Sequence, residues 1–132
     1  MTAEAYFRNV NRAMIAFDLA LGSGTVLAPD ATLRVLGHDR PDSETRELFR
    51  RLGPIWLTFA AAHAIAEARG EPRDWWALAW LRATEIATDA TWARSPAFRR
   101  PGARLALWLA GAGNLSMALG FGYLASRRRP KQ

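Results

Sequence analysis

Three ionisable residues lie close together in an otherwise apolar stretch of the sequence. Arg82, Glu85 and Asp89 are three and four residues apart, so a helix would place them on one face, with each within reach of its neighbour. Two carboxyls beside one guanidinium behave differently, because the cation keeps one ionised while the other holds a proton. The pattern predicts a general acid, either Glu85 or Asp89, with Arg82 fixing the charge. An intramembrane ion pair that holds helices in register is the structural alternative.

Two further stretches carry candidates for the matching base. Asp18 is flanked by apolar residues, and nothing in its own stretch neutralises it, so it must meet Arg82, His63 or a proton. His63 and Glu67 are four residues apart, a spacing at which a carboxylate can orient an imidazole that accepts protons. We therefore expect Asp18 or His63 to act as the base. The alternative places Glu67 at the level of lipid headgroups and gives His63 a hydrogen bond to a neighbouring helix.

The walls of such a site would be amide and aromatic. Asn114 is the only amide in the last apolar stretch, and Phe59, Trp76 and Trp80 could line a pocket and stabilise a cationic intermediate through their ring faces. No metal and no cofactor are expected, because neither the Glu-x-x-His nor the His-Glu-x-x-His spacing occurs. The sequence also contains no cysteine, which excludes thiol chemistry and disulfide scaffolds.

Four apolar stretches must position these residues, and each is long enough for a helix. They are rich in Ala and Leu and lack the alternation of a half-buried strand. Proline and glycine separate them, at Pro29, at Gly70 with Pro72, and at Pro96 to Gly102. The last stretch carries no charge and is long enough to cross about 30 Å of hydrocarbon. The predicted spans are residues 13–28, 52–68, 75–92 and 105–125.

The polar residues of these stretches form narrow stripes on otherwise apolar cylinders. Asn11, Asp18 and Thr25, for example, recur at steps of seven. A soluble helix shows the opposite pattern, an apolar stripe on a polar cylinder. Ionisable groups within membrane helices face the bundle interior and pair with one another. We therefore predict one all-α domain over residues 1–132, an antiparallel four-helix transmembrane bundle that is oligomeric and buries one polar cluster. A soluble helical bundle with these charges turned outward is the alternative.

The charge distribution indicates a membrane partner and no nucleic acid. Lys and Arg outnumber Asp and Glu by 18 to 12, yet no predicted helix carries a continuous basic face with interleaved aromatic residues. The densest basic run follows the last apolar stretch, where it is typical of a membrane surface, and comprises Arg127, Arg128, Arg129 and Lys131. We expect a multi-pass protein of the cell membrane, with both termini on the cytoplasmic side.

Several short motifs, each present once, follow one another along most of the chain. They are Pro29 after the first stretch, Leu36-Gly37 in the connector, Arg51-Leu-Gly53 before the second stretch, residues 66–69 at its end, and Arg82 with Asp89 in the third. This order resembles the DoxX-like group of small four-helix membrane proteins. The resemblance implies a membrane bundle and, for some members, association with membrane redox proteins. It implies no particular catalytic residue.

Three functions remain open on these grounds. The first is acid–base chemistry on a lipophilic small molecule that enters from the bilayer, such as isomerisation, cyclisation or epoxide opening. The second is an accessory subunit of a membrane redox complex, in which the ion pairs serve assembly. The third is a proton-coupled carrier, because intramembrane carboxylates are also typical of carriers.

Overall fold

The computed structural model describes residues 1–38, 41–96 and 100–127, and within these ranges it contains six α-helices and no strand. The prediction of an all-α fold is confirmed. Four helices are long and correspond to the four predicted stretches, whereas two short helices occupy the first connector. The helices are α1 (Ala3–Leu27), α2 (Pro29–Val35), α3 (Ser43–Arg50), α4 (Gly53–Arg69), α5 (Pro72–Arg94) and α6 (Pro101–Ser126).

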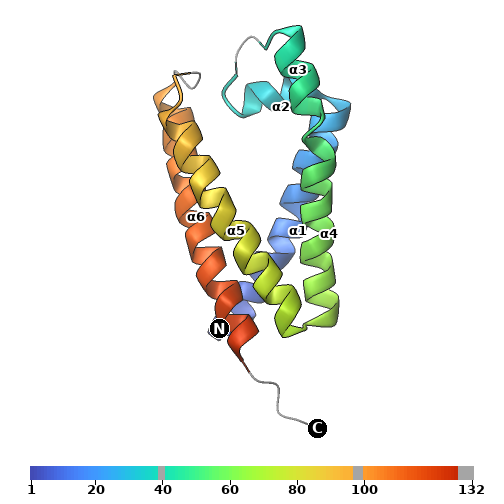
Figure 1. The fold of residues 1–132 in the computed structure, drawn as a ribbon, viewed down its shortest axis with the longest axis vertical. Coiled ribbons are helices and arrows are strands. Elements are labelled where there is room, and N and C mark those ends of the chain that lie inside the picture. Colours follow the sequence, from blue (N-terminus) through green and yellow to red (C-terminus); the bar gives the residue numbers. More distant parts are fainter. Residues whose placement is uncertain (39–40, 97–99, 128–132) are drawn as a thin grey trace.

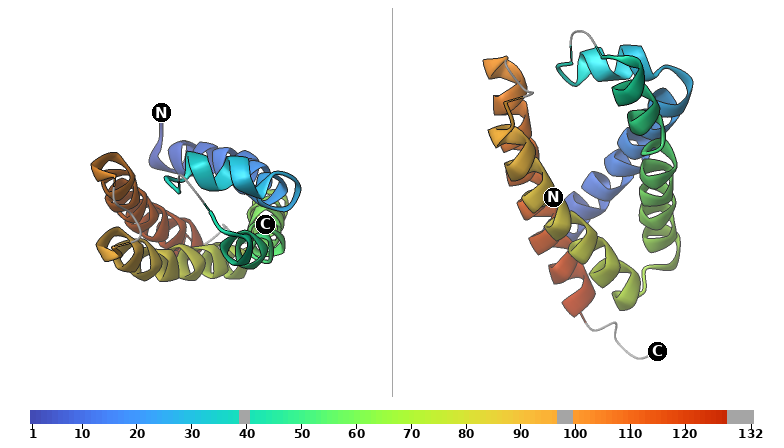
Figure 2. Two further views of the ribbon diagram at one scale, coloured as in Figure 1. Left: turned by 90° about the horizontal axis from the view of Figure 1, so that it is seen from above. Right: turned by 45° about the horizontal axis from the view of Figure 1, so that its top comes forward.

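The long helices form two antiparallel pairs that diverge from a shared end (Figure 1). Helix α1 packs along α4, and α5 packs along α6, while the two pairs contact each other much less. Figure 2 shows the helices from two further directions, and the V is visible again in its right-hand view, with α2 and α3 lying across the open end of the α1/α4 pair. The N-terminus of α1 and the C-terminus of α6 meet at the closed end.

Local sequence signals account for most helix boundaries. Proline occupies the first turn of α2, α4, α5 and α6, where its missing N–H costs nothing. The side chains of Thr2 and Asp42 accept hydrogen bonds from backbone N–H groups at the starts of α1 and α3. Gly70 ends α4 in the left-handed conformation, with φ of 64°, as the predicted break requires.

Glycines set how closely helices approach each other, both within the α1/α4 pair and between the two pairs. These two pairs are the arms of the V. A Cβ added at Gly22 of α1 would lie 2.9 Å from the carbonyl oxygen of Gly53 in α4, so these two backbones are in near contact. A Cβ at Gly120 of α6 would overlap the ring of Phe7 in α1. The first contact fixes the open end of the α1/α4 pair, and the second fixes the closed end of the V.

The polar stripe of α1 faces inward, as the sequence predicts. The buried residues of this helix are Asn11, Asp18, Gly22 and Thr25, whereas its neighbouring residue Phe17 is 56% exposed. The main apolar cluster lies at the closed end of the V and consists of Ala66, Trp75, Leu78, Ala79, Phe121, Leu124 and Ala125. Leu33 of α2 and Phe49 of α3 are buried outside this cluster.

One helix of the described chain is long and apolar enough to cross a membrane. Helix α6 has a mean hydropathy of 1.3 over its most apolar window, and only 17% of that window is buried. Of the predicted basic tail, Arg127 reaches back to Glu4 and lies over the ring of Tyr123. Arg128, Arg129 and Lys131 lie outside the described residues.

Candidate functional site

Three long helices contribute to a buried polar cluster at the level where the arms begin to separate. Nη2 of Arg82 in α5 lies 2.5 Å from Oδ2 of Asp18 in α1 and 2.6 Å from Nε2 of His63 in α4. The three residues are 4%, 1% and 0% exposed, respectively. Burying Asp18 and Arg82 is tolerable because their charges are opposite and Nε2 of His63 provides a second acceptor for the guanidinium. Of the partners open to Asp18, the structure selects Arg82.

The hydrogen bonds around His63 fix its tautomer. Nδ1 of His63 lies 2.6 Å from Oδ1 of Asn11, while Nδ2 of Asn11 donates to the His63 carbonyl oxygen at 3.1 Å. Because Oδ1 of Asn11 can only accept, Nδ1 of His63 carries the proton. Nε2 of His63 then accepts from Nε of Arg82 at 3.2 Å. Both ring nitrogens of His63 are thus hydrogen-bonded, and the ring holds the guanidinium of Arg82 in place.

A cavity of about 500 Å³ opens between the two arms beside this cluster. It is partly open to the outside, and most of its wall is formed by Leu, Ile, Met, Phe and Trp side chains. This combination of an apolar wall with a few convergent polar groups is typical of small-molecule sites. The polar residues that line it are Asp18, Arg82, Glu85, Thr88, Asp89 and Asn114.

Two polar groups of this wall have acceptor capacity to spare. Nδ2 of Asn114 donates to Oδ2 of Asp89 at 2.8 Å, and Gly111 lies beside them, where an added Cβ would be in ordinary van der Waals contact with Cβ of Asp89 at 3.5 Å. The Oδ1 atom of Asn114 is buried and has no hydrogen-bond partner among the described residues. Glu85 is half-buried, and no hydrogen bond or ion pair joins it to the described part of the chain.

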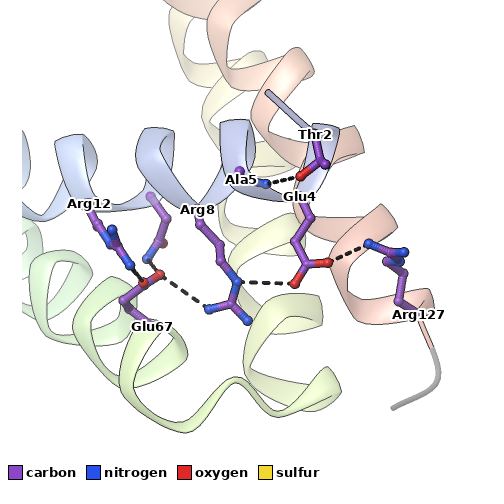
Figure 3. Close-up of polar contacts among 8 residues, drawn as sticks. Thr2, Glu4, Ala5, Arg8, Arg12, Glu67 and Arg127 are labelled. Atoms are coloured by element: carbon purple, nitrogen blue, oxygen red, sulfur yellow. Dashed lines mark hydrogen bonds and ion pairs between the residues drawn. The ribbon is translucent and has the colours of Figure 1, made fainter. Parts of the chain in front are cut away.

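Glu67 lies away from the cavity, at the closed end of the V. Its Oε1 accepts from Arg12 at 2.9 Å, and its Oε2 accepts from Asn11 at 3.3 Å. Figure 3 shows Glu67 of α4 facing Arg8 and Arg12 of α1. The predicted direct pairing of Glu67 with His63 is therefore wrong, because Asn11 stands between them. Sequence reasoning missed Asn11 as the residue that orients His63, although its position in the seven-residue stripe of α1 was a signal.

The aromatic wall differs from the predicted one. Phe59 lines the cavity as expected, whereas Trp76 and Trp80 are 57% and 74% exposed on the outer surface of α5. They cannot wall the site because Arg82, Glu85 and Asp89 occupy the opposite face of the same helix. Trp56 and Trp92 line the cavity in their place. Trp92 lies seven residues after Glu85, a spacing that returns to the same helix face.

The acidic groups do not assemble into a metal-ligating set. Among the described residues, no group of three or more His, Asp or Glu side chains could hold a metal ion. The carboxyl groups of Asp18, Glu85 and Asp89 instead lie on different parts of one wall, with Arg82 bound to the first of them. Such a wall can donate a proton, accept a proton and bind a cation.

The comparisons with known proteins give no relative from which function could be transferred. The sequence matches no family model, no curated protein and no solved structure. The geometry of the cavity therefore carries the functional argument alone.

Proposed function

We propose that the chain is a multi-pass membrane protein in which α1, α4, α5 and α6 all cross the bilayer. Two features support this: each long helix turns polar side chains inward, and many large apolar side chains are exposed on the outside. The buried polar residues are Asn11, Asp18, Thr25, His63, Arg82, Asp89 and Asn114. Leu109 and Leu119 of α6 are 63% and 68% exposed, while Asp18 is 1% exposed. A bundle in water would gain from the reverse arrangement. The basic tail favours cytoplasmic termini, and exposed apolar surface favours a homo-oligomer.

Within the bilayer, the cavity binds a lipophilic small molecule and performs acid–base chemistry on it. The observation that carries this proposal is the partly open cavity of about 500 Å³, whose apolar wall contains three carboxyl groups and one guanidinium. A purely structural ion pair would not need an accessible cavity, nor a carboxyl such as Glu85 that has no hydrogen bond or ion pair to the described residues.

Acid and base lie on different arms of the V. Glu85 in α5 is the candidate acid, because it lines the cavity and no hydrogen bond or ion pair to the described residues competes with a bound molecule for its proton. Asp18 in α1 is the candidate base, because it lines the cavity and Nη2 of Arg82, 2.5 Å from its Oδ2, supplies the opposite charge. A molecule between the arms would receive a proton from Glu85 and lose one to Asp18. Its atomic composition is then unchanged, so the reaction is an isomerisation or a cyclisation.

Arg82, His63 and Asn11 act as positioning residues in this scheme. His63 and Asp18 hold the guanidinium from two sides, and Asn11 fixes the ring of His63. The proton that Asp18 gains must return to Glu85 before the next cycle, and both residues line the same cavity. Epoxide opening would need water as an additional reactant.

The test follows hydrogen exchange into the native substrate pool. Purified protein is incubated in D2O with a lipid extract of the membranes in which it was expressed, and mass spectrometry records deuterium incorporation and new isomers. We expect label in at least one lipophilic compound with the unmodified protein and none with Glu85→Gln or Asp18→Asn. Glu71→Gln is the matched control, because Glu71 is an exposed carboxyl outside the cavity. Equal labelling by the unmodified protein and Glu85→Gln would contradict the proposal.

One observation favours a second candidate, an accessory subunit of a membrane redox complex. The contacts of Arg82 with Asp18 and His63 join α1, α4 and α5, which is what an assembly role for the ion pairs requires. If Glu85→Gln and Asp18→Asn both abolish the folded bundle and no lipid is labelled, the accessory role is supported. Elution volume and far-UV ellipticity of the variants separate these outcomes.

A further inference from the structure

The Asp89–Asn114 pair on the α5/α6 arm neither gives nor takes a proton in the acid–base scheme, yet it lines the cavity. Asn114 is 7% exposed, and its Oδ1 has no hydrogen-bond partner in the described part of the chain. A buried acceptor without a donor costs about 1–3 kcal/mol, so a ligand that supplies the donor is favoured. Since Nδ2 of Asn114 is already bonded to Asp89, this position can only accept.

The charge of the cavity wall favours a ligand that carries a positive charge. Its described lining residues include the three acids Asp18, Glu85 and Asp89 and a single cation, Arg82. That cation is engaged by Asp18 and His63, and no ion pair joins Asp89 to the described residues. A carboxylate in an apolar surrounding is costly unless it meets an opposite charge. The wall therefore lacks a positive charge beside Asp89.

Resting on the proposed function, we infer that the ligand of this cavity is a lipophilic primary or secondary amine, bound as an ammonium ion by Asp89 and Asn114. One N–H donates to Oδ1 of Asn114 and another to the carboxylate of Asp89. The aromatic side chains of Trp56, Phe59 and Trp92 in the same wall suit a cation through their ring faces, and the remaining apolar wall takes the hydrocarbon. Glu85 stays free to act as the acid.

Other polar head groups satisfy only part of this wall. A hydroxyl supplies a donor for Asn114 but no charge for Asp89. A quaternary ammonium supplies the charge but no N–H donor. A carboxylate supplies neither and is repelled by the acids. The four head groups therefore have an expected order of affinity. This order tests the ammonium anchor, which is the pair Asp89 and Asn114, without knowledge of the natural ligand.

The experiment uses four probes that share one hydrocarbon cage: 1-aminoadamantane, 1-adamantanol, adamantane-1-carboxylate and N,N,N-trimethyl-1-adamantylammonium. Their affinities for the full chain in a non-ionic detergent are measured by isothermal titration calorimetry at pH 7. We expect the amine to bind at least tenfold more tightly than the alcohol and more tightly than the quaternary ion, and the carboxylate not to bind. Alcohol or carboxylate binding as tightly as the amine would overturn the inference.

Two variants locate the anchor. Asp89→Asn is expected to lower the affinity for the amine at least tenfold while leaving that for the alcohol within about twofold, and Asn114→Leu is expected to weaken amine binding severalfold. The control Glu71→Gln should bind all four probes as the unmodified protein does. Unchanged amine affinity in folded Asp89→Asn overturns the assignment. If either variant fails to fold, the ranking of the four probes on the unmodified chain still decides.

The outcomes separate this inference from the proposed function. If the alcohol binds as tightly as the amine, the lipophilic cavity stands and the ammonium anchor fails. If none of the four probes binds, the anchor fails, whereas deuterium labelling of the native lipid pool still decides on the acid–base chemistry.

Discussion

Removing Arg82 tests whether the polar stripes of the helices meet inside the protein. In Arg82→Met, the carboxyl of Asp18, only 1% exposed, loses the guanidinium that lies 2.5 Å away, and Nε2 of His63 loses its donor. Breaking a buried pair by removal of one partner typically costs about 3–5 kcal/mol, because an uncompensated charge is left behind. We expect a loss of this size in the free energy of unfolding.

The double variant Asp18→Leu with Arg82→Met separates the pair from its two members. Replacing both charges by apolar side chains leaves no uncompensated ion, and such replacements are often neutral or stabilising by about 1–4 kcal/mol. We therefore expect the double variant to be at least as stable as the unmodified protein, to within about 1 kcal/mol. In a double-mutant cycle with the two single variants, the changes in the free energy of unfolding would then be strongly non-additive.

The assay is unfolding by SDS in mixed micelles, followed by tryptophan fluorescence and far-UV ellipticity. Arg46→Met is the matched control, because Nε of Arg46 lies 2.7 Å from Oδ1 of Asp30 while both side chains are 36–42% exposed. An exposed pair contributes about 0–1 kcal/mol. If Arg82→Met costs no more than Arg46→Met, or if the two cavity substitutions are additive, the Asp18–Arg82 pair is not buried and the argument for an enclosed site fails.

Two further predictions concern a helix contact and a helix cap. Gly120→Ala should lower the free energy of unfolding by about 1–3 kcal/mol, because the new Cβ would overlap the Phe7 ring. Gly113→Ala should be neutral or stabilising by up to about 1 kcal/mol, because a Cβ there meets no heavy atom within 4 Å beyond its own stretch of helix. The same SDS titration compares the two variants, and equal effects would contradict the close approach of α1 and α6. At the start of α3, hydrogen bonds from Thr45, chiefly the one from its backbone N–H, lower the pKa of Asp42 below its ordinary value of 3.8. The ionised Asp42 cap therefore stabilises α3 fully above pH 3.8, and this effect is lost as the pH falls through the lower folded-state pKa. The protection factors of the α3 amides, which are their exchange rates relative to an unstructured peptide at the same pH, should fall over this range, and this pH dependence should be absent in Asp42→Asn.

The four long helices were predictable because length and composition define them locally. Their predicted spans differ from the observed helices mainly at the ends, where polar residues extend the helix beyond its apolar stretch, as at Ala3 of α1 and Pro72 of α5. The short helices α2 and α3 were not predicted. Each has only seven or eight residues, and each depends on its start, Pro29 in one case and the Asp42 cap in the other. Periodicity has too few residues there to give a signal.

Three members of the buried cluster, Asp18, His63 and Arg82, were predictable from the sequence, but their pairing was not. Spacing shows that Asp18 and Arg82 face inward, yet it leaves open whether Asp18 meets Arg82, His63 or a proton. The choice depends on how far each helix is shifted along its neighbour, which contacts such as Gly22 with Gly53 determine. The same limit explains Glu67, whose spacing from His63 is right for a contact within α4. Arg12 and Asn11 of α1 provide partners that the sequence of α4 cannot reveal.

The division of the site between the two arms has a chemical consequence. Asp18 belongs to the α1/α4 arm, whereas Glu85 and Asp89 belong to the α5/α6 arm. Groups on one helix face lie side by side and reach a bound molecule from the same direction, whereas groups on facing helices reach it from opposite sides. The bonds from Arg82 to Asp18 and His63 tie the arms together just below the cavity, so they limit how far acid and base can separate. Substitutions that loosen this tie should therefore disturb the chemistry even where the carboxyl groups themselves remain.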